Sequence, residues 1–177
     1  MVRDERSRVM FSFWQILTVF LVAVTVAFPL AHAAELPGKM RLAKDTYLAV
    51  QAIYYPGFTL GAFAEPASIV ATLVLLVFTS AWSPAFWCVL AALALLLAMH
   101  AVYWIVTHPV NGFWLQDQPL TGASAGFFSF GVRKDRAADP GREDGWKRLR
   151  DRWEYSHVVR AALATLSLIL LLISVTI

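Results

Sequence analysis

The segment 152–160 places an acid, an imidazole and two guanidinium groups directly before a long apolar run. It reads RWEYSHVVR and is followed by AALATLSLILLLISVTI. At about 3.6 residues per turn, Glu154, His157 and Arg160 fall on one face of a helix together with Trp153. A base that is oriented by a carboxylate, beside a cation that stabilises an oxyanion, can remove a proton from a carbon acid. The spacing therefore predicts a helix that presents acid–base groups at its start.

The composition indicates an integral membrane protein. Of the 177 residues, 59% are hydrophobic and 15% are charged, whereas soluble domains are about 45–50% apolar and about 25% charged. The runs long enough to cross a bilayer are 9–34, 56–80, 84–106 and 153–177. The net charge is only +3 and the basic residues flank these runs, which favours contacts with the lipid bilayer and excludes nucleic acid as the expected partner.

The first run also has features of a targeting segment. Three arginines precede it and Ala-His-Ala lies near its end, as in a cleavable signal peptide. The run is nevertheless longer than the apolar region of about 7–15 residues that such signals contain. We therefore expect it to be retained as a membrane helix.

The connections predict an all-α, antiparallel up-down four-helix bundle that forms a single transmembrane domain over 1–177. Runs two and three are separated only by a tight turn, which makes them antiparallel neighbours. The connection 35–55 opens with Glu-Leu-Pro-Gly-Lys, which predicts a turn, and its second half has the aromatic spacing of an interfacial helix. In the connection 107–152, the spacing of Trp146, Leu149 and Trp153 predicts that the last helix starts near residue 143.

The basic residues predict the orientation. Eleven Lys and Arg residues lie in the two long connections and three in the N-terminal tail. The positive-inside rule then places both connections in the cytoplasm and both termini outside. The long basic connection is also a candidate docking site for a protein partner or for anionic lipid.

The ionisable residues of the runs share one leaflet. His32 and Glu35 end the first run, and Glu65 and His100 lie roughly 12–14 Å deep in the second and third. Charged groups in hydrocarbon normally face the bundle interior or a cavity, so we expect a polar pocket that faces the cytoplasm. On the third run, Trp104 and His108 share the face of His100, although Pro109 disfavours a helical conformation at His108. A structural Glu65–His100 pair, and interfacial positions for the helix-end residues, remain open.

Two stretches resemble a family of small four-helix membrane proteins of unknown function that is related to the anthrone oxygenases. One is His-Pro-Val-Asn at 108–111 with Arg-Trp-Glu-x-x-His-x-x-Arg at 152–160. The other is Ala-His-x-x-Glu-Leu-Pro-Gly-Lys-x-Arg-Leu at 31–42 with Tyr-Leu-Ala-Val-Gln-x-Ile-Tyr at 47–54, which resembles a bacterial branch. The resemblance implies a four-helix bundle in a bacterial inner (cell) membrane and, for the fungal relatives, oxidation of an anthrone by O2. The segment 119–145 departs from the compact loop expected of the family.

Three hypotheses for the function remain open. The first is a cofactor-independent oxidoreductase that acts on a hydrophobic aromatic small molecule. In this hypothesis His157 is the base, and Glu154 or Glu65 orients its imidazole. Arg160 and Asn111 stabilise the oxyanion. Trp153 packs against the aromatic ring of the substrate. His100, Trp104 and His108 complete the substrate-binding set.

The second hypothesis is an iron or haem site, since bundle di-iron centres use Glu and Glu-x-x-His units. Its candidate ligands are His32, Glu35, Glu65, His100, Glu154 and His157. The third is a non-catalytic membrane subunit or small transporter, in which the polar layer only joins the helices. A ligand-sized cavity with unpaired polar groups favours an enzyme, whereas a fully paired layer favours the third hypothesis.

Overall fold

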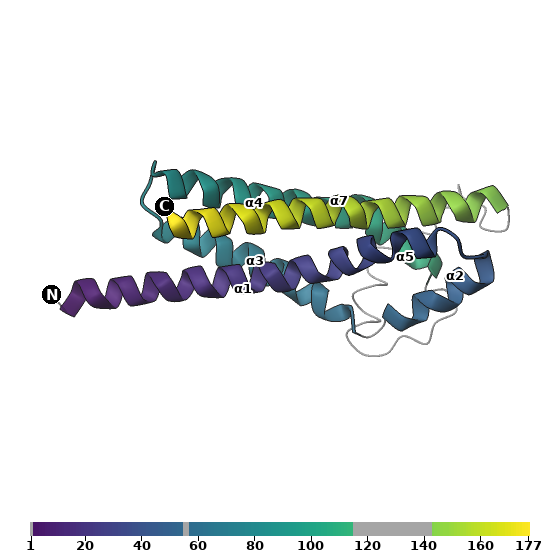
Figure 1. Ribbon diagram of the computed structural model, residues 1–177, viewed down its shortest axis with the longest axis horizontal. Coiled ribbons are helices and arrows are strands. Elements are labelled where there is room, and N and C mark those ends of the chain that lie inside the picture. Colours follow the sequence, from purple (N-terminus) through teal and green to yellow (C-terminus); the bar gives the residue numbers. More distant parts are fainter. Residues whose placement is uncertain (1, 55–56, 115–142) are drawn as a thin grey trace.

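The computed structural model describes residues 2–54, 57–114 and 143–177, and every regular element in these ranges is a helix (Figure 1). The four long helices are α1 (Val2–Lys39), α3 (Thr59–Phe78), α4 (Pro84–Val102) and α7 (Glu143–Thr176). The connection after α1 contains α2 (Lys44–Gln51) and the short 3₁₀ turn η1 (Ala52–Tyr54), and α4 continues through η2 (Tyr103–Thr107) into α5 (His108–Trp114). The predicted all-α fold and the presence of a helix in the first connection are confirmed.

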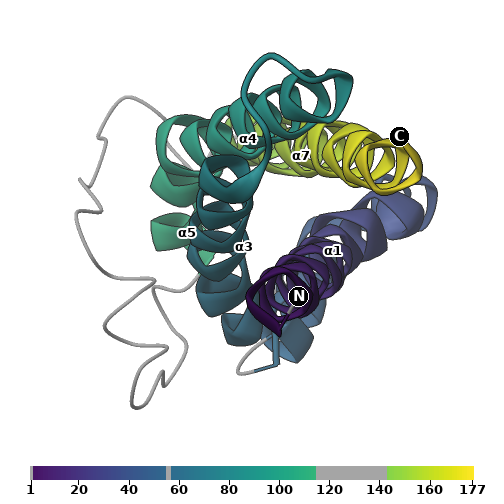
Figure 2. The same cartoon turned by 90° about the vertical axis from the view of Figure 1, so that its left-hand side faces the viewer.

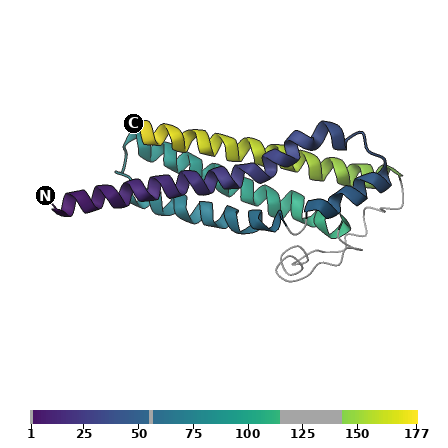
Figure 3. The same cartoon turned by 60° about the horizontal axis from the view of Figure 1, so that its bottom comes forward.

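The long helices form a four-membered ring. Neighbouring helices pack as α1 with α3, α3 with α4, α4 with α7, and α7 with α1, so that α3 and α7 lie across the bundle from each other (Figure 2). The N- and C-termini lie at one end, and α2 and α5 lie at the other (Figure 3). Four segments are long and apolar enough to cross a membrane, and a third of the most apolar window of each is buried in the bundle. Outward-facing side chains such as Ile16 and Val77 are apolar and exposed, as a lipid-facing surface requires.

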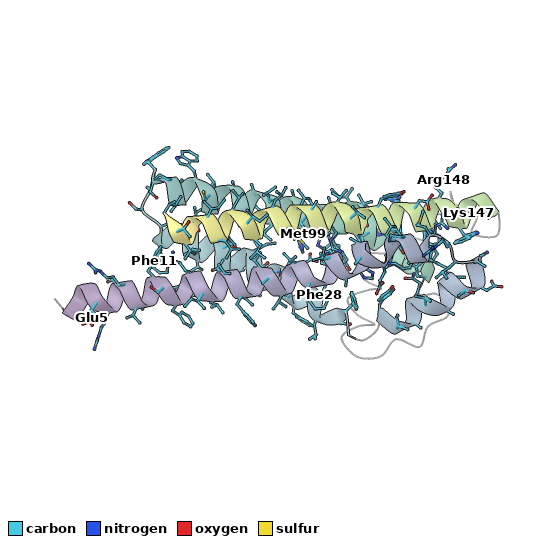
Figure 4. All side chains as sticks on the ribbon, viewed as in Figure 1. Glu5, Phe11, Phe28, Met99, Lys147 and Arg148 are labelled. Carbon is cyan, nitrogen blue, oxygen red and sulfur yellow. The ribbon has the colours of Figure 1, made fainter. Side chains whose placement is uncertain are left out.

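The interior changes character along the bundle. Toward the termini it is an apolar core of Val22, Leu75, Val89, Leu96 and Leu171 with their neighbours, beside buried hydroxyls such as those of Thr18 and Ser167. Toward α2 and α5 it contains buried charged and imidazole groups. Figure 4 shows positions along the bundle. Glu5 lies at the terminal end, Phe28 and Met99 lie near the middle, and Lys147 and Arg148 lie at the far end. The polar layer therefore lies in one half of the bundle, as predicted.

The turn predicted at 35–39 is wrong, because α1 remains helical through Pro37 to Lys39. Pro37 cannot donate to the Ala33 carbonyl, and the chain leaves the helix shortly afterwards. The turn that follows is closed by the bonds Arg41 N to Gly38 O and Leu42 N to Lys39 O, both 3.1 Å long. The longer helix keeps Glu35 and Lys39 one turn apart on the same face. The expected start of the last helix near residue 143 is confirmed. The segment 119–145, with its expected membrane contact and partner-docking role, lies almost entirely outside the described residues.

The expectation that Pro109 would take His108 out of the helix is also wrong. His108 has helical φ and ψ of −58° and −42°, and the preceding residues 103–107 form a π-helical turn. Proline at 109 cannot donate to the Ile105 carbonyl as a helical residue would. Arg152 Nη2 donates to that carbonyl instead, at 3.0 Å, so α7 satisfies the acceptor that proline leaves free.

Replacing Arg152 with Met should therefore destabilise the junction between α4 and α5. We expect a loss of about 1 kcal/mol, because a hydrogen bond from a charged donor to a freed carbonyl is removed at an exposed position. Unfolding of the protein by SDS titration in detergent micelles measures this loss. Arg148→Met, an exposed arginine one turn earlier on the same helix, is the control, and an equal loss in both variants contradicts the assignment.

Candidate functional site

A cavity of about 60 Å³ lies in the polar half of the bundle, between the four long helices. Its wall is mainly aromatic and apolar, with a few polar side chains that come from every long helix. It is lined by Phe28, Pro29, His32, Tyr54, Phe58, Gly61, Ala62, Glu65, His100, Tyr103, Thr107, Asn111, Trp153, His157 and Arg160. Of the predicted site residues, His32, Glu65, His100, Asn111, Trp153, His157 and Arg160 are thus brought together.

A chain of polar contacts crosses the cavity wall from α7 to α4. Arg160 on α7 pairs with Glu65 Oε1 on α3, across the bundle. The other carboxylate oxygen, Oε2, accepts from His100 Nδ1 at 3.2 Å, and Trp104 Nε1 donates to His100 Nε2 at 2.9 Å. The predicted pairing of Glu65 with His100 is thus present in the structure, and Arg160 supplies the counter-charge that burial of a carboxylate requires.

The partners of the imidazoles fix their tautomers. Indole and guanidinium N–H groups only donate, so His100 must accept at Nε2 and carry its proton on Nδ1. Arg160 Nη1 lies 3.3 Å from His157 Nδ1, so His157 accepts at Nδ1 and, when neutral, carries its proton on Nε2. The His157 partner is therefore an arginine, and the predicted contact of His157 with Glu154 or Glu65 is absent from the contacts of the described residues.

Glu154 instead belongs to a second buried cluster, centred on Lys39. Lys39 Nζ lies 2.8 Å from Glu154 Oε2, 3.5 Å from Glu35 Oε2 and 3.4 Å from His32 Nδ1. The Lys39 ammonium thus lies among two carboxylates and one imidazole. Because lysine only donates, His32 Nδ1 is an acceptor in the same way as His157 Nδ1.

Lys39 was missed as a site residue because its place in the sequence groups it with the cations of the connection. The signal that points to it is the spacing of His32, Glu35 and Lys39, which lie on one face once α1 is known to reach residue 39.

Two tyrosines of the first connection complete the second cluster and were also missed. Tyr47 Oη donates to Glu154 Oε1 at 2.9 Å, and Tyr54 Oη donates to Glu35 Oε2 at 2.5 Å. Burial, and then the Glu154 carboxylate, raise the pKa of Tyr47 far above its usual value. Burial and the bond to Glu35 likewise raise the pKa of Tyr54. Both phenols therefore remain protonated donors that join the connection to α1 and α7.

Aromatic rings form the side of the cavity between the two clusters. The ring centroids of His32 and His157 are 4.1 Å apart, and Trp153 lies 4.9 Å from His32 and 4.4 Å from His157. Trp153 Nε1 donates to Asn111 Oδ1 at 2.8 Å. Since the indole only donates, it orients the Asn111 amide and leaves the Nδ2 group for other acceptors.

Four predicted site residues lie off the cavity wall. Trp104 lies behind the wall, where its Nε1 donates to His100 Nε2 and its ring lies 5.3 Å from that of Tyr103. His108 packs against Trp104 with ring centroids 4.8 Å apart. Glu35 and Glu154 belong to the Lys39 cluster. The expectation that Trp104 and His108 line a substrate pocket therefore receives no support from this arrangement.

The metal hypothesis is not supported by the donor arrangement. Within the described part of the chain, no group of three or more His, Cys, Asp or Glu side chains is placed to hold a metal ion. Glu65 and Glu154, which are buried carboxylates, already face Arg160 and Lys39. For haem, His100 Nε2 would have to give up its bond to Trp104 to act as an axial ligand.

Comparison with known proteins identifies the family of this chain. The family model described as anthrone oxygenase matches residues 58–170, which is more than half of the 177-residue chain. No curated protein and no solved structure gives a significant match. The matched region contains α3, α4, α5 and most of α7, and with them Glu65, His100, Asn111, His157 and Arg160. This chain belongs to the anthrone oxygenase family.

Proposed function

We propose that this membrane protein is an oxidoreductase that converts the CH2 group of an anthrone-like aromatic ketone into a carbonyl with O2. For anthrone itself the balance is C14H10O + O2 giving anthraquinone, C14H8O2, and water. The carbon loses four electrons, one oxygen atom enters the new carbonyl and the other leaves as water. The substrate supplies every electron, so the scheme requires only a base, an oxyanion site and a dry space for O2.

The observation that carries this proposal is Glu65, a buried carboxylate in the wall of an aromatic-lined cavity. Among the described residues of the wall it is the only carboxylate. Its Oε1 faces Arg160 and its Oε2 accepts from His100. A carboxylate has about four lone-pair sites. Glu65 therefore keeps lone pairs for a proton, whereas the neutral tautomers of His100 and His157 present no free basic nitrogen.

The reaction then follows from these groups. Glu65 takes a proton from the CH2 group, whose carbanion is delocalised over the rings and the ketone oxygen. The carbanion reduces O2 and forms a C–O bond to it, and Glu65 returns the proton to give a hydroperoxide. Removal of the remaining C–H proton with cleavage of the O–O bond forms the carbonyl and releases hydroxide, which takes that proton and leaves as water.

The size of the cavity constrains how a substrate enters. A volume of about 60 Å³ holds a few water molecules or O2, whereas sites for drug-sized ligands measure about 300–1,000 Å³. The walls must therefore separate to admit a three-ring ketone. Phe28 and Phe58 are only partly buried and meet edge to face at 5.5 Å, so this aromatic pair can open toward the lipid without moving a charged group.

The alternative is a non-catalytic membrane subunit or small transporter. The observation that favours it is the dense pairing of the polar layer, in which Arg160 faces Glu65 and Lys39 faces Glu154. In either case we place both long connections in the cytoplasm and both termini outside a bacterial inner membrane, from the distribution of Lys and Arg.

An assay separates the two functions. Purified protein in lipid nanodiscs is given anthrone in oxygen-saturated buffer, and anthraquinone is quantified against protein-free nanodiscs. The proposal predicts product formation proportional to protein, with one O2 consumed per anthraquinone. A rate equal to that of empty nanodiscs, for anthrone and for its hydroxylated analogues, contradicts the enzyme and leaves the structural role.

A further inference from the structure

We infer that His157 donates a hydrogen bond from Nε2 to the oxygen of the bound ligand, and that this bond makes the site prefer an oxygen-bearing ring system over the bare hydrocarbon. This inference rests on the proposed function and adds to it the residue that holds the ligand oxygen. It also revises the role expected for His157 from the sequence, which was that of a base.

The first step is to establish which ring nitrogen of His157 donates a hydrogen bond and which accepts one. Its Nδ1 faces the guanidinium of Arg160, 3.3 Å from Nη1, and a guanidinium has no acceptor. The neutral ring must therefore have its proton on Nε2. That atom is buried and has no hydrogen-bond partner within the described part of the chain, and the His157 side chain, 5% exposed, forms part of the cavity wall.

The second step is that Arg160 and Asn111 also present donors beside His157. Arg160 uses Nη1 for His157 and Nη2 for Glu65, while its Nε is buried without a partner in the described residues. Asn111 accepts the indole N–H of Trp153, so its amide presents N–H groups to the remaining space. Three side chains of one cavity wall are thus donors.

The third step is the class of ligand that matches this wall. Buried donors without acceptors are costly, so a ligand that supplies an oxygen acceptor is favoured. The surrounding rings of His32, Tyr54, Phe58 and Trp153 match a flat apolar body. Glu65 disfavours a carboxylate-bearing ligand beside it, while Arg160 keeps the local charge balanced. An aromatic ketone or its enolate meets all of these conditions.

The test has two arms that use the whole protein in nanodiscs. In the first, ¹⁵N-histidine NMR reports which ring nitrogen carries the proton; the chain has only four histidines, and His157→Phe assigns the signal of His157. In the second, quenching of tryptophan fluorescence measures binding of anthraquinone and of anthracene, which share a ring system but differ in the carbonyl oxygens. Tyr155→Phe, on the exposed side of α7, is the matched control.

We expect a protonated Nε2 on His157, and a preference of about tenfold for anthraquinone over anthracene. That preference should fall to about twofold or less in His157→Phe and persist in Tyr155→Phe. A proton on Nδ1, or a preference unchanged in His157→Phe, overturns the inference and leaves the proposed function standing. Failure of both ring systems to bind, in protein with the expected tautomer, overturns the ligand assignment and the proposed function together.

Discussion

The Glu65→Gln variant should oxidise anthrone about 10²–10⁴ times more slowly than the unchanged protein, which is the usual contribution of a positioned base. Glutamine keeps the length of the side chain and an acceptor oxygen for the Arg160 guanidinium, but it cannot take the proton. The measurement is the rate of anthraquinone formation in nanodiscs at saturating O2. Glu65→Asp, which keeps a carboxylate that is one methylene shorter, should recover part of the loss.

The main alternative explanation for a loss of rate is damage to the fold. The Glu65→Gln substitution leaves the buried Arg160 without a counter-ion, which weakens the bundle. The variant must therefore keep its helical circular dichroism and its elution volume before its rate is interpreted. Asp45→Asn removes an exposed carboxylate from α2 and should leave the rate within about twofold, since its charge is screened by solvent. Equal rates for Glu65→Gln and the unchanged protein would remove Glu65 from the mechanism.

The partial success of sequence reasoning has a physical reason. Depth along a helix follows from residue number, so Glu65 and His100 were expected at one height, and the structure places Glu65 Oε2 3.2 Å from His100 Nδ1. Periodicity also gives the face of a helix, which grouped His157 with Arg160. Neither quantity states which helices lie opposite each other. The contact of Arg160 with Glu65 depends on α7 and α3 lying across the ring, and that arrangement is set by the packing of the whole bundle.

The misses have a common origin at helix ends. Proline and glycine at 37 and 38 predicted a turn, but the tertiary contacts of Lys39 with Glu154 and His32 outweigh this local preference. At 109, the missing N–H of proline is compensated by Arg152, a residue 47 positions away from its acceptor Ile105. Local propensity is a weak prior when a partner from another helix satisfies the freed groups. Lys39, Tyr47 and Tyr54 were missed because their partners Glu154 and Glu35 lie on other helices, which spacing along one segment does not show.

Lys39→Met should be the most destabilising single change in the second cluster, at about 3–5 kcal/mol. It leaves Glu154, whose side chain is 0% exposed, without a cation in the described surroundings, and it removes the donor to His32 Nδ1. The free energy of unfolding is measured by SDS titration in micelles. Arg41→Met, which removes an exposed cation two residues further along, should change this free energy by less than about 1 kcal/mol.

The double variant Lys39→Met/Glu154→Leu distinguishes a loss of attraction from an isolated buried charge. If most of the cost of Lys39→Met is the unpaired carboxylate, removing that carboxylate recovers most of the stability, since apolar replacements of buried ion pairs are often neutral. Tyr47 then loses its acceptor, so recovery should stop about 1 kcal/mol short. Strictly additive losses would instead show that Lys39 and Glu154 are not coupled. Full recovery of stability without recovery of anthrone oxidation would show that the ion pair is retained for the site, because Lys39 also fixes the His32 tautomer beside His157.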